Sequence, residues 1–258
     1  MRTVRPDVVA LRIEGLARSF GAKVAVEAVD LEVPRGSWFG LVGPNGAGKS
    51  TTLAMATGLL RPDSGRAEVF GVDVWSRRAD AQRLLGVLPD GLALPERLTG
   101  RELLRFTGLL RGMAPADVER RAGDLLGVLG LDDAPRTLVA EYSTGMRKKI
   151  GLAAALLHAP RLLVLDEPLE AVDPVSAATI KGLLRRYVDD GGTVVFSSHV
   201  MAVVEQVCDR VAAIVDGRVV AAGTTAEVAA GAGLEARFVS LVGGRGRRIE
   251  EGLPWLRP

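Results

Sequence analysis

The chain has 258 residues, which is enough for one sizeable core or at most two small domains. Its formal net charge is +2, so charge gives no reason to expect a nucleic-acid surface, and no nucleic-acid partner is expected. The single cysteine, Cys208, excludes an internal disulfide framework. The longest apolar runs, such as residues 150–157, are far shorter than the roughly 18 residues needed to cross a bilayer. We therefore expect a soluble, cytoplasmic protein that acts on a membrane only through a partner.

The first seventy residues predict strands around one helix. Residues 8–20 and 29–33 mix apolar and polar side chains in near-alternation, which is typical of half-buried strands. Residues 38–42 form a short apolar run that ends in a glycine-rich loop, so a buried strand is expected there. A helix should follow over residues 50–58. After a strong turn signal, residues 67–70 predict another strand.

The next eighty residues, about 79–157, have helical spacing and are rich in Leu, Arg and Ala. One helix face is predicted to carry Leu103, Leu104, Phe106 and Leu110. The segment is interpreted as a mostly helical insertion.

Short buried strands return after the insertion, with helices between them, at residues 161–165, 193–197 and 211–215. This alternation favours a mostly parallel sheet and an α/β fold. The last part, residues 229–258, is predicted to be a C-terminal extension with a loop at 243–248 and a mobile end.

Residues 43–51 match the pattern G-x-x-x-x-G-K-[ST], between a predicted strand and a predicted helix. Glycines let the backbone curl so that several N–H groups point at one phosphate, and the helix N-terminus favours an anion there. Lys49 can reach the β- and γ-phosphates, and the Ser50 hydroxyl can ligate Mg²⁺. The context disfavours the alternative of a glycine-rich turn capped by Ser50. The predicted cradle consists of Gly43, Pro44, Asn45, Gly46, Ala47, Gly48, Lys49, Ser50 and Thr51.

The predicted strand that ends at Leu165 is followed by two acids, Asp166 and Glu167. Open α/β sheets bind ligands at the carboxyl ends of their strands. Asp166 suits the Mg²⁺ shell, directly or through water, and Glu167 should point towards an attacking water. Two solvated acids at a strand end are the alternative, which the nearby phosphate cradle makes less attractive.

The sequence Tyr-Ser-Thr-Gly-Met at residues 142–146 resembles the signature of the ATP-binding cassette ATPases, which is usually Leu-Ser-Gly-Gly-Gln. Ser143 and Gly145 match that signature, and the other three positions depart from it. A small hydroxyl and a glycine at a helix N-terminus make an anion site, although an ordinary helix cap is the alternative. In the family, this segment binds the γ-phosphate held by the opposite subunit.

Three more residues fit the same resemblance in chain order. Asp173 resembles the aspartate of the loop that follows the acidic pair, and His199 resembles the switch histidine that contacts the γ-phosphate. Phe20 matches the aromatic residue that stacks on adenine, with a core position as the alternative. One position departs: after the strand near residues 86–89, the family usually has a glutamine, bound to Mg²⁺ and touching the membrane partner, where this chain has Asp90. Asp90 could still ligate the metal with a different geometry.

The resemblance implies a P-loop NTPase (RecA-like) core at residues 8–228, with an N-terminal antiparallel β subdomain and a helical subdomain inserted at about 87–160. It also implies a head-to-tail homodimer or pseudo-dimer of cassettes with ATP and Mg²⁺ between them. Lys49, Glu167 and His199 are the expected catalytic residues. The implied function is ATP hydrolysis for a separate transmembrane permease, of exporter type, on the inner face of the cell membrane. A soluble single-cassette remodeller or assembly scaffold is the alternative, and a binding module without catalysis is a third.

Overall fold

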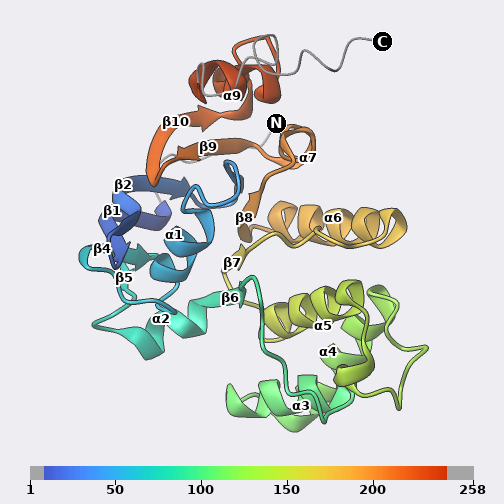
Figure 1. Ribbon diagram of the computed structural model, residues 1–258. Helices are drawn as coiled ribbons and strands as arrows, with labels where there is room; N and C mark the ends of the chain where they lie inside the picture. The colour runs from blue at the N-terminus through green and yellow to red at the C-terminus, as the bar shows by residue number, and fades with distance from the viewer. Residues whose placement is uncertain (1–8, 243–258) are drawn as a thin grey trace, which may run out of the picture.

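The computed structural model describes residues 9–242 of the protein, which are built on two β-sheets (Figure 1). The smaller sheet is antiparallel, with strand order β2-β1-β4-β5. Its strands are β1 (Val9–Phe20), β2 (Lys23–Pro34), β4 (Ser64–Val69) and β5 (Val72–Asp73). The antiparallel subdomain implied for the N-terminus is therefore confirmed.

The hairpin of β1 and β2 is longer than the sequence predicted, because β2 begins at Lys23 and not at residue 29. Phe20 pairs with Lys23 across a tight turn that contains Gly21 at a φ of 59°. A positive φ suits glycine, so this turn lets the chain reverse at once. Pairing with β1 thus extends β2 over residues 23–28, whose own sequence pattern gave only a weak strand signal.

The larger sheet has the strand order β10-β9-β3-β8-β7-β6 and is parallel from β9 to β6, with β10 antiparallel at one edge. This confirms the predicted mostly parallel sheet. Strand β10 was not predicted, and β6 lies within the stretch expected to be mostly helical, where the family resemblance implied a strand near residues 86–89. The strands are β3 (Trp38–Val42), β6 (Leu85–Leu88), β7 (Leu162–Leu165), β8 (Thr193–Ser198), β9 (Arg210–Val215) and β10 (Arg218–Thr224).

Helices cover the larger sheet and extend away from it (Figure 1). Helices α3 and α4 lie beyond α5, at a distance from both sheets, and α6 lies on the other side of α5. The helices are α1 (Lys49–Ala56), α2 (Arg78–Leu84), α3 (Gly100–Leu110), α4 (Pro115–Val128), α5 (Thr144–Leu156), α6 (Pro174–Asp189), α7 (Met201–Val207), α8 (Thr225–Ala229) and α9 (Leu234–Val242), with a 3-10 turn at Val139–Glu141.

The buried face of α3 differs from the predicted one. Leu103 and Leu104 are buried as expected, whereas Phe106 and Leu110 are 49% and 72% exposed. The difference arises because glycine determines which side of α3 faces the other helices. A Cβ at Gly108 would lie 2.6 Å from a methyl group of Val118 on α4, so the two helices approach closely there.

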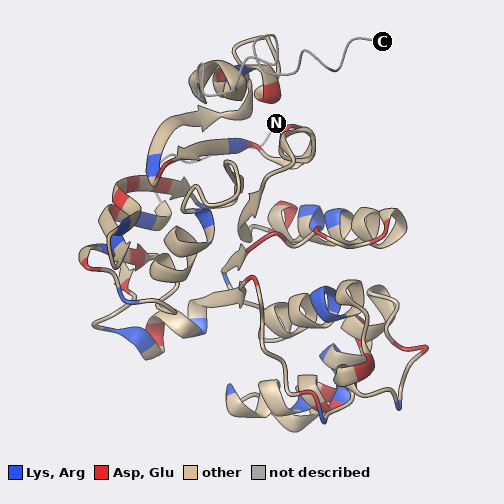
Figure 2. Cartoon of the chain, viewed as in Figure 1, with Lys and Arg blue, Asp and Glu red and all other residues tan. Residues whose placement is uncertain are grey.

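Charged residues of both signs lie on the strands of the smaller sheet (Figure 2). Arg12 pairs with Glu32 at 2.9 Å, and Arg66 pairs with Glu14 at 2.6 Å.

Cys208 is buried beneath β3, where a Cβ at Gly40 would lie 3.0 Å from its Sγ atom.

The sequence did not predict the last two helices: α8 ends at Ala229, where the C-terminal extension begins, and α9 lies within the extension. Leu234, at the start of α9, is buried, and its N–H donates to Glu205 of α7 at 3.2 Å. The loop expected at residues 243–248 lies outside the described residues. Within residues 9–242, no helix combines the length and the apolar character that a membrane span requires.

Gly86 lies where β6 meets the end of α5, and a side chain there would be severely crowded. An added Cβ would lie 2.7 Å from Leu163 Cδ2, 2.8 Å from Pro160 Cγ and closer still to the Ala155 carbonyl oxygen. We predict that Gly86→Ala lowers the free energy of unfolding by about 1–3 kcal/mol in urea denaturation. Gly182→Ala, in the middle of α6 with open space around it, is the matched control and should raise stability by about 0.5–1 kcal/mol. Equal stability of the two variants would contradict this packing.

Candidate functional site

The predicted phosphate cradle is a tight loop between β3 and the N-terminus of α1. Gly46 and Gly48 have φ values of 79° and 103°, a region that side chains other than glycine rarely adopt. A Cβ at Gly48 would also lie 2.5 Å from the Ala25 carbonyl oxygen, and one at Gly43 would overlap the Ile214 carbonyl oxygen. The curl of the backbone therefore favours glycine at positions 46 and 48, and the strands packed against the loop leave no room for a side chain at positions 43 and 48.

Lys49 begins α1, and its side chain is only 6% exposed. Its Nζ atom donates to the Gly43 carbonyl at 2.7 Å and to the Pro44 carbonyl at 3.2 Å. It also lies 3.7 Å from Glu167 Oε1. The loop thus holds the ammonium group next to its own backbone, within reach of an anion bound there.

The acidic pair follows β7, as predicted, and one hydroxyl connects its two members. Asp166 is 4% exposed, and its N–H donates to the Leu88 carbonyl at 2.7 Å. The Ser197 hydroxyl on β8 donates to Asp166 Oδ1 and accepts from the Glu167 N–H at 2.9 Å. Glu167 has a φ of 46°. The chain therefore leaves β7 through a left-handed residue whose backbone is fixed by Ser197.

Glu167 is the point where three predicted catalytic side chains meet. His199 follows β8, and its Nδ1 atom lies 3.1 Å from the same Glu167 Oε1 that faces Lys49. The Glu167 side chain is 12% exposed and that of His199 is 40% exposed. An acid, an imidazole and an ammonium group are thus brought together at the carboxyl edge of the sheet, the place where open α/β sheets bind ligands.

A cavity of about 480 Å³ opens over these residues. Its lining residues come from the first hairpin, the phosphate loop, the segment after β6, the segment after β7 and the segment after β8. Lys23, Ala25 and Glu170 also line it and were not predicted, because nothing in their local pattern points to a ligand. The lining consists of Phe20, Lys23, Ala25, Asn45, Gly46, Ala47, Gly48, Lys49, Ser50, Thr51, Asp90, Glu167, Glu170 and His199.

Phe20 lies at the rim of this cavity and is 49% exposed, so it is not a core residue. The guanidinium of Arg18 lies 5.1 Å from the centre of its ring, a distance typical of a cation–π contact. Asp63 holds Arg18 at 2.6 Å and also accepts from the Ser19 N–H at 2.8 Å. These hydrogen bonds lower the pKa of Asp63, the one from Ser19 contributing most. Arg18, itself held by Asp63, therefore supports the Phe20 ring, which remains accessible to a ligand.

Three predicted ligand residues lie away from this cavity and have local structural contacts. Ser143 caps α5 by accepting from the Met146 N–H at 3.2 Å, and Asp173 caps α6 by accepting from the Ser176 N–H at 2.9 Å. Hydrogen bonds from Ser176 lower the pKa of Asp173. Gly145 packs near the Ala171 carbonyl oxygen, which would lie 3.2 Å from an added Cβ. Within one chain, then, the Ser-x-Gly segment is separate from the phosphate loop.

The oxygen donors suit Mg²⁺ only in combination with a nucleotide. Ser50 and Asp90 line the cavity, whereas Asp166 is buried next to Glu167 and is not part of the lining. Among the described residues, no three acidic, histidine or cysteine side chains form a ready metal cluster. Mg²⁺ typically keeps several waters and takes one or two carboxylates together with substrate phosphates. This donor set fits that pattern and not an all-protein cage.

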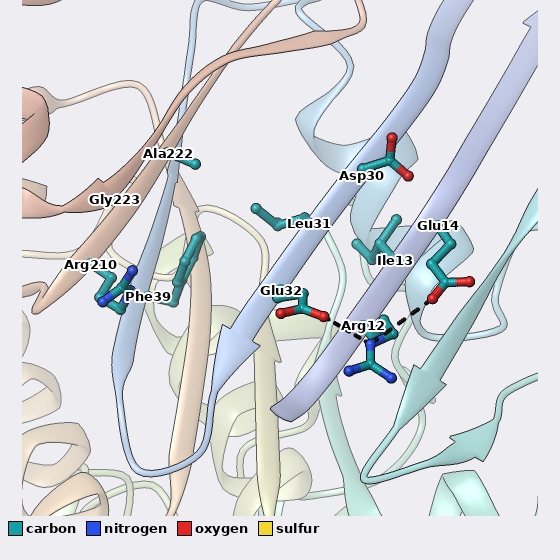
Figure 3. A pocket seen from close by; sticks show the side chains of 10 residues that line it. All are labelled: Arg12, Ile13, Glu14, Asp30, Leu31, Glu32, Phe39, Arg210, Ala222 and Gly223. Atoms are coloured by element: carbon teal, nitrogen blue, oxygen red, sulfur yellow. Dashed lines mark hydrogen bonds and ion pairs between the residues drawn. The ribbon is translucent and has the colours of Figure 1, made fainter. Parts of the chain in front are cut away.

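A second cavity, of about 370 Å³, lies between the smaller sheet and the edge of the larger one (Figure 3). Its lining includes Arg12, whose guanidinium lies 2.9 Å from Glu32 and 4.0 Å from Glu14. The charged groups at one end of this cavity are thus paired with each other, and no predicted site residue lies there.

Comparison with known proteins agrees with this geometry. Residues 26–170 match the family model described as ABC transporter. The daunorubicin/doxorubicin resistance ATP-binding protein DrrA of Streptomyces peucetius is 42% identical over 219 residues, which make up 85% of this chain and 66% of that protein. The linearmycin resistance ATP-binding protein LnrL of Bacillus subtilis (strain 168) is 36% identical over 84% of this chain and 70% of that protein. The chain thus spans about two thirds of the length of these relatives.

A solved structure of an ATP-binding subunit of an ABC transporter superimposes with a TM-score of 0.84 at 30% identity, covering 90% of this chain and 99% of that one. The family match over residues 26–170 includes the phosphate loop and the acidic pair. The chain therefore belongs to the ABC transporter family, with the fold of its ATP-binding subunits.

Proposed function

We propose that this chain binds and hydrolyses ATP to drive export by a separate transmembrane permease. The observation that carries the proposal is the meeting of Lys49, Glu167 and His199 over the phosphate loop. A merely structural acid would not need a lysine and a histidine at the same oxygen. The similarity to two proteins named for drug resistance favours export as the direction of transport.

Each group has a role that its position supports. The backbone N–H groups of residues 45–51 and the Lys49 side chain would bind the phosphates, and Phe20 would stack on the base. Glu167 would orient the attacking water and accept its proton, with His199 next to it contacting the γ-phosphate. A bound Mg²⁺ ion would supply charge neutralisation at the phosphates, held by Ser50, Asp90 and, directly or through water, Asp166.

The exposed Ser-x-Gly segment favours a dimer. Ser143 is exposed at the N-terminus of α5, yet it does not line the cavity of its own chain. A helix N-terminus attracts anions. In a head-to-tail pair, the segment Ser143–Gly145 of one chain would meet the nucleotide held by the other, and Asp173 would lie near the same interface. Hydrolysis would then depend on assembly.

The cassette is proposed to extend over residues 8–228, with its helical subdomain at about 87–160 and an extension at 229–258. We place the protein on the cytoplasmic face of the cell membrane, bound to its permease through the helical subdomain. The relatives disfavour the alternative of a soluble remodeller or scaffold, since both compared proteins are named as ATP-binding proteins for drug resistance.

Ser197 is predicted to position the acidic pair. Removing its hydroxyl leaves the Glu167 N–H and one Asp166 oxygen without their partner, so Ser197→Ala should reduce turnover about tenfold while the Kd for ATP changes less than about threefold. Steady-state kinetics and fluorescent-nucleotide titration measure the two quantities. Thr193→Val is the control: at the other end of β8 it removes a hydrogen bond from the Gly36 N–H, so it should cost stability but not turnover. Equal turnover losses in both variants would refute the role of Ser197.

Glu167→Gln tests the catalytic base and the dimer together. The amide cannot take a proton from water, so turnover should fall by roughly two orders of magnitude or more while ATP binding persists. ATP-bound protein should then accumulate as a dimer in analytical ultracentrifugation. Lys49→Ala is the matched control and should weaken nucleotide binding itself, leaving a monomer. Normal turnover in Glu167→Gln would remove Glu167 from the mechanism, and a monomer at saturating ATP would remove the dimer.

The permease can be identified directly. Tagged Glu167→Gln protein, incubated with ATP and detergent-solubilised native membranes, should recover a polytopic membrane protein in stoichiometric amount by affinity purification and mass spectrometry. The Lys49→Ala variant should recover the same protein whenever docking does not require nucleotide, and less of it otherwise. Recovery of soluble proteins alone, with the chain absent from membranes, would favour the remodeller or scaffold function instead.

A further inference from the structure

Lys148 connects the helix that carries the Ser-x-Gly segment with the acidic end of the ATP site. It lies one turn into α5, and its side chain is only 13% exposed. Its Nζ atom is 3.1 Å from the Glu167 carbonyl oxygen, 3.5 Å from the Asp166 carbonyl oxygen and 3.3 Å from Asp90 Oδ1. A single ammonium group thus contacts both residues of the acidic pair and the carboxylate that replaces the family's usual glutamine.

Lys148 does not line the ATP cavity, so it reaches these residues from outside that cavity. Asp90 lines the ATP cavity and also a third, mostly apolar cavity of about 390 Å³, which Lys148 lines as well. Glu170 likewise lines both cavities. Asp90 therefore stands between a cation on one side and the nucleotide position on the other. Its side chain is 56% exposed, so it is free to respond to both.

Lys148 contacts the side chain of Asp90 but the backbone of Glu167. Glu167 adopts a left-handed backbone conformation, which is costly for a residue other than glycine and persists only where its surroundings hold it. The Ser197 hydroxyl accepts from its N–H, and its carbonyl oxygen accepts from Lys148 and, at 3.2 Å, from the Glu170 N–H. An ammonium-to-carbonyl hydrogen bond in a site of low exposure is stronger than a neutral one.

We propose that Lys148 is a positioning residue of the ATP site, which holds the backbone of Glu167 in place and competes with the divalent cation for Asp90. The inference rests on the proposed function, because it takes Asp90 as a cation ligand. It predicts two effects of opposite sign. Without the Lys148 charge, the cation should bind more tightly at Asp90, while turnover should fall because the Glu167 carbonyl oxygen keeps only its hydrogen bond from the Glu170 N–H.

The test uses full-length protein with the non-hydrolysable analogue AMP-PNP and Mn²⁺ as the cation, titrated by the EPR signal of free Mn²⁺. Lys148→Met should lower the Kd for Mn²⁺ about fivefold, the effect of removing one screened charge near 4 Å. With ATP and Mg²⁺, the same variant should lose turnover about tenfold. A general loss of structure would instead weaken both. Lys148→Arg keeps the charge and should bind Mn²⁺ as the wild type does.

Two further variants test whether Lys148 affects Mn²⁺ binding through Asp90. Asp90→Asn removes the carboxylate, so adding Lys148→Met to it should change the Kd for Mn²⁺ by less than about twofold. Arg147→Gln is the matched control: Arg147 precedes Lys148 on the same helix and pairs with Glu96 at 2.8 Å, but does not contact the acidic pair. It should retain wild-type turnover and Mn²⁺ affinity. Should Lys148→Met fail to fold, Lys148→Gln replaces it, with the same expectations.

Unchanged or weaker Mn²⁺ binding in the neutral variant, full turnover, or an equal tightening in the Asp90→Asn background would each overturn the proposal. These outcomes differ from a failure of the proposed function. In that case the wild-type protein itself would bind neither AMP-PNP nor Mn²⁺ in the same titration.

Discussion

The register of the parallel strands places the chemistry of this protein at one edge of its larger sheet. Val42, the last residue of β3, pairs with Ser198 at the end of β8, and Leu165 of β7 pairs with Phe196. The phosphate loop, the acidic pair and His199 therefore all begin at the same level of the sheet. The backbone hydrogen bonds that fix this register also fix the distances between side chains separated by more than a hundred residues in the sequence.

Contiguous features of the site were predictable, and contacts between distant segments were not. The phosphate loop and the acidic pair each carry their chemistry within a few neighbouring residues, which a local pattern can reveal. Ser197 and Lys148 are different, because each acts on residues well removed along the chain and has no distinctive neighbours of its own. Their roles become visible only when the strands and α5 are placed in space.

The strands likewise divide into those that the local sequence predicts and those that depend on pairing with a distant strand. The buried strand β3 and the acidic strand β7 were predicted nearly to their ends, since a short run of apolar side chains suffices to identify them. Strand β6 lies within a stretch of helical composition, and its strand conformation depends on pairing with β7. Strand β10 likewise forms by pairing with β9 at the sheet edge. Phe106 was assigned to the wrong face because a glycine, Gly108, and not an apolar side chain defines where α3 touches α4.

The burial of Cys208 has a practical consequence for studying this protein. Burial, with a smaller contribution from Asp209, raises the pKa of its thiol well above the usual range, so the reactive thiolate is scarcely formed at neutral pH. The sequence contains no other cysteine. A cysteine introduced at an exposed position such as Leu110 would therefore react selectively with a fluorophore or spin label, while the native thiol stays in place. Movements of the helical subdomain could then be followed by spectroscopy in the otherwise unaltered chain.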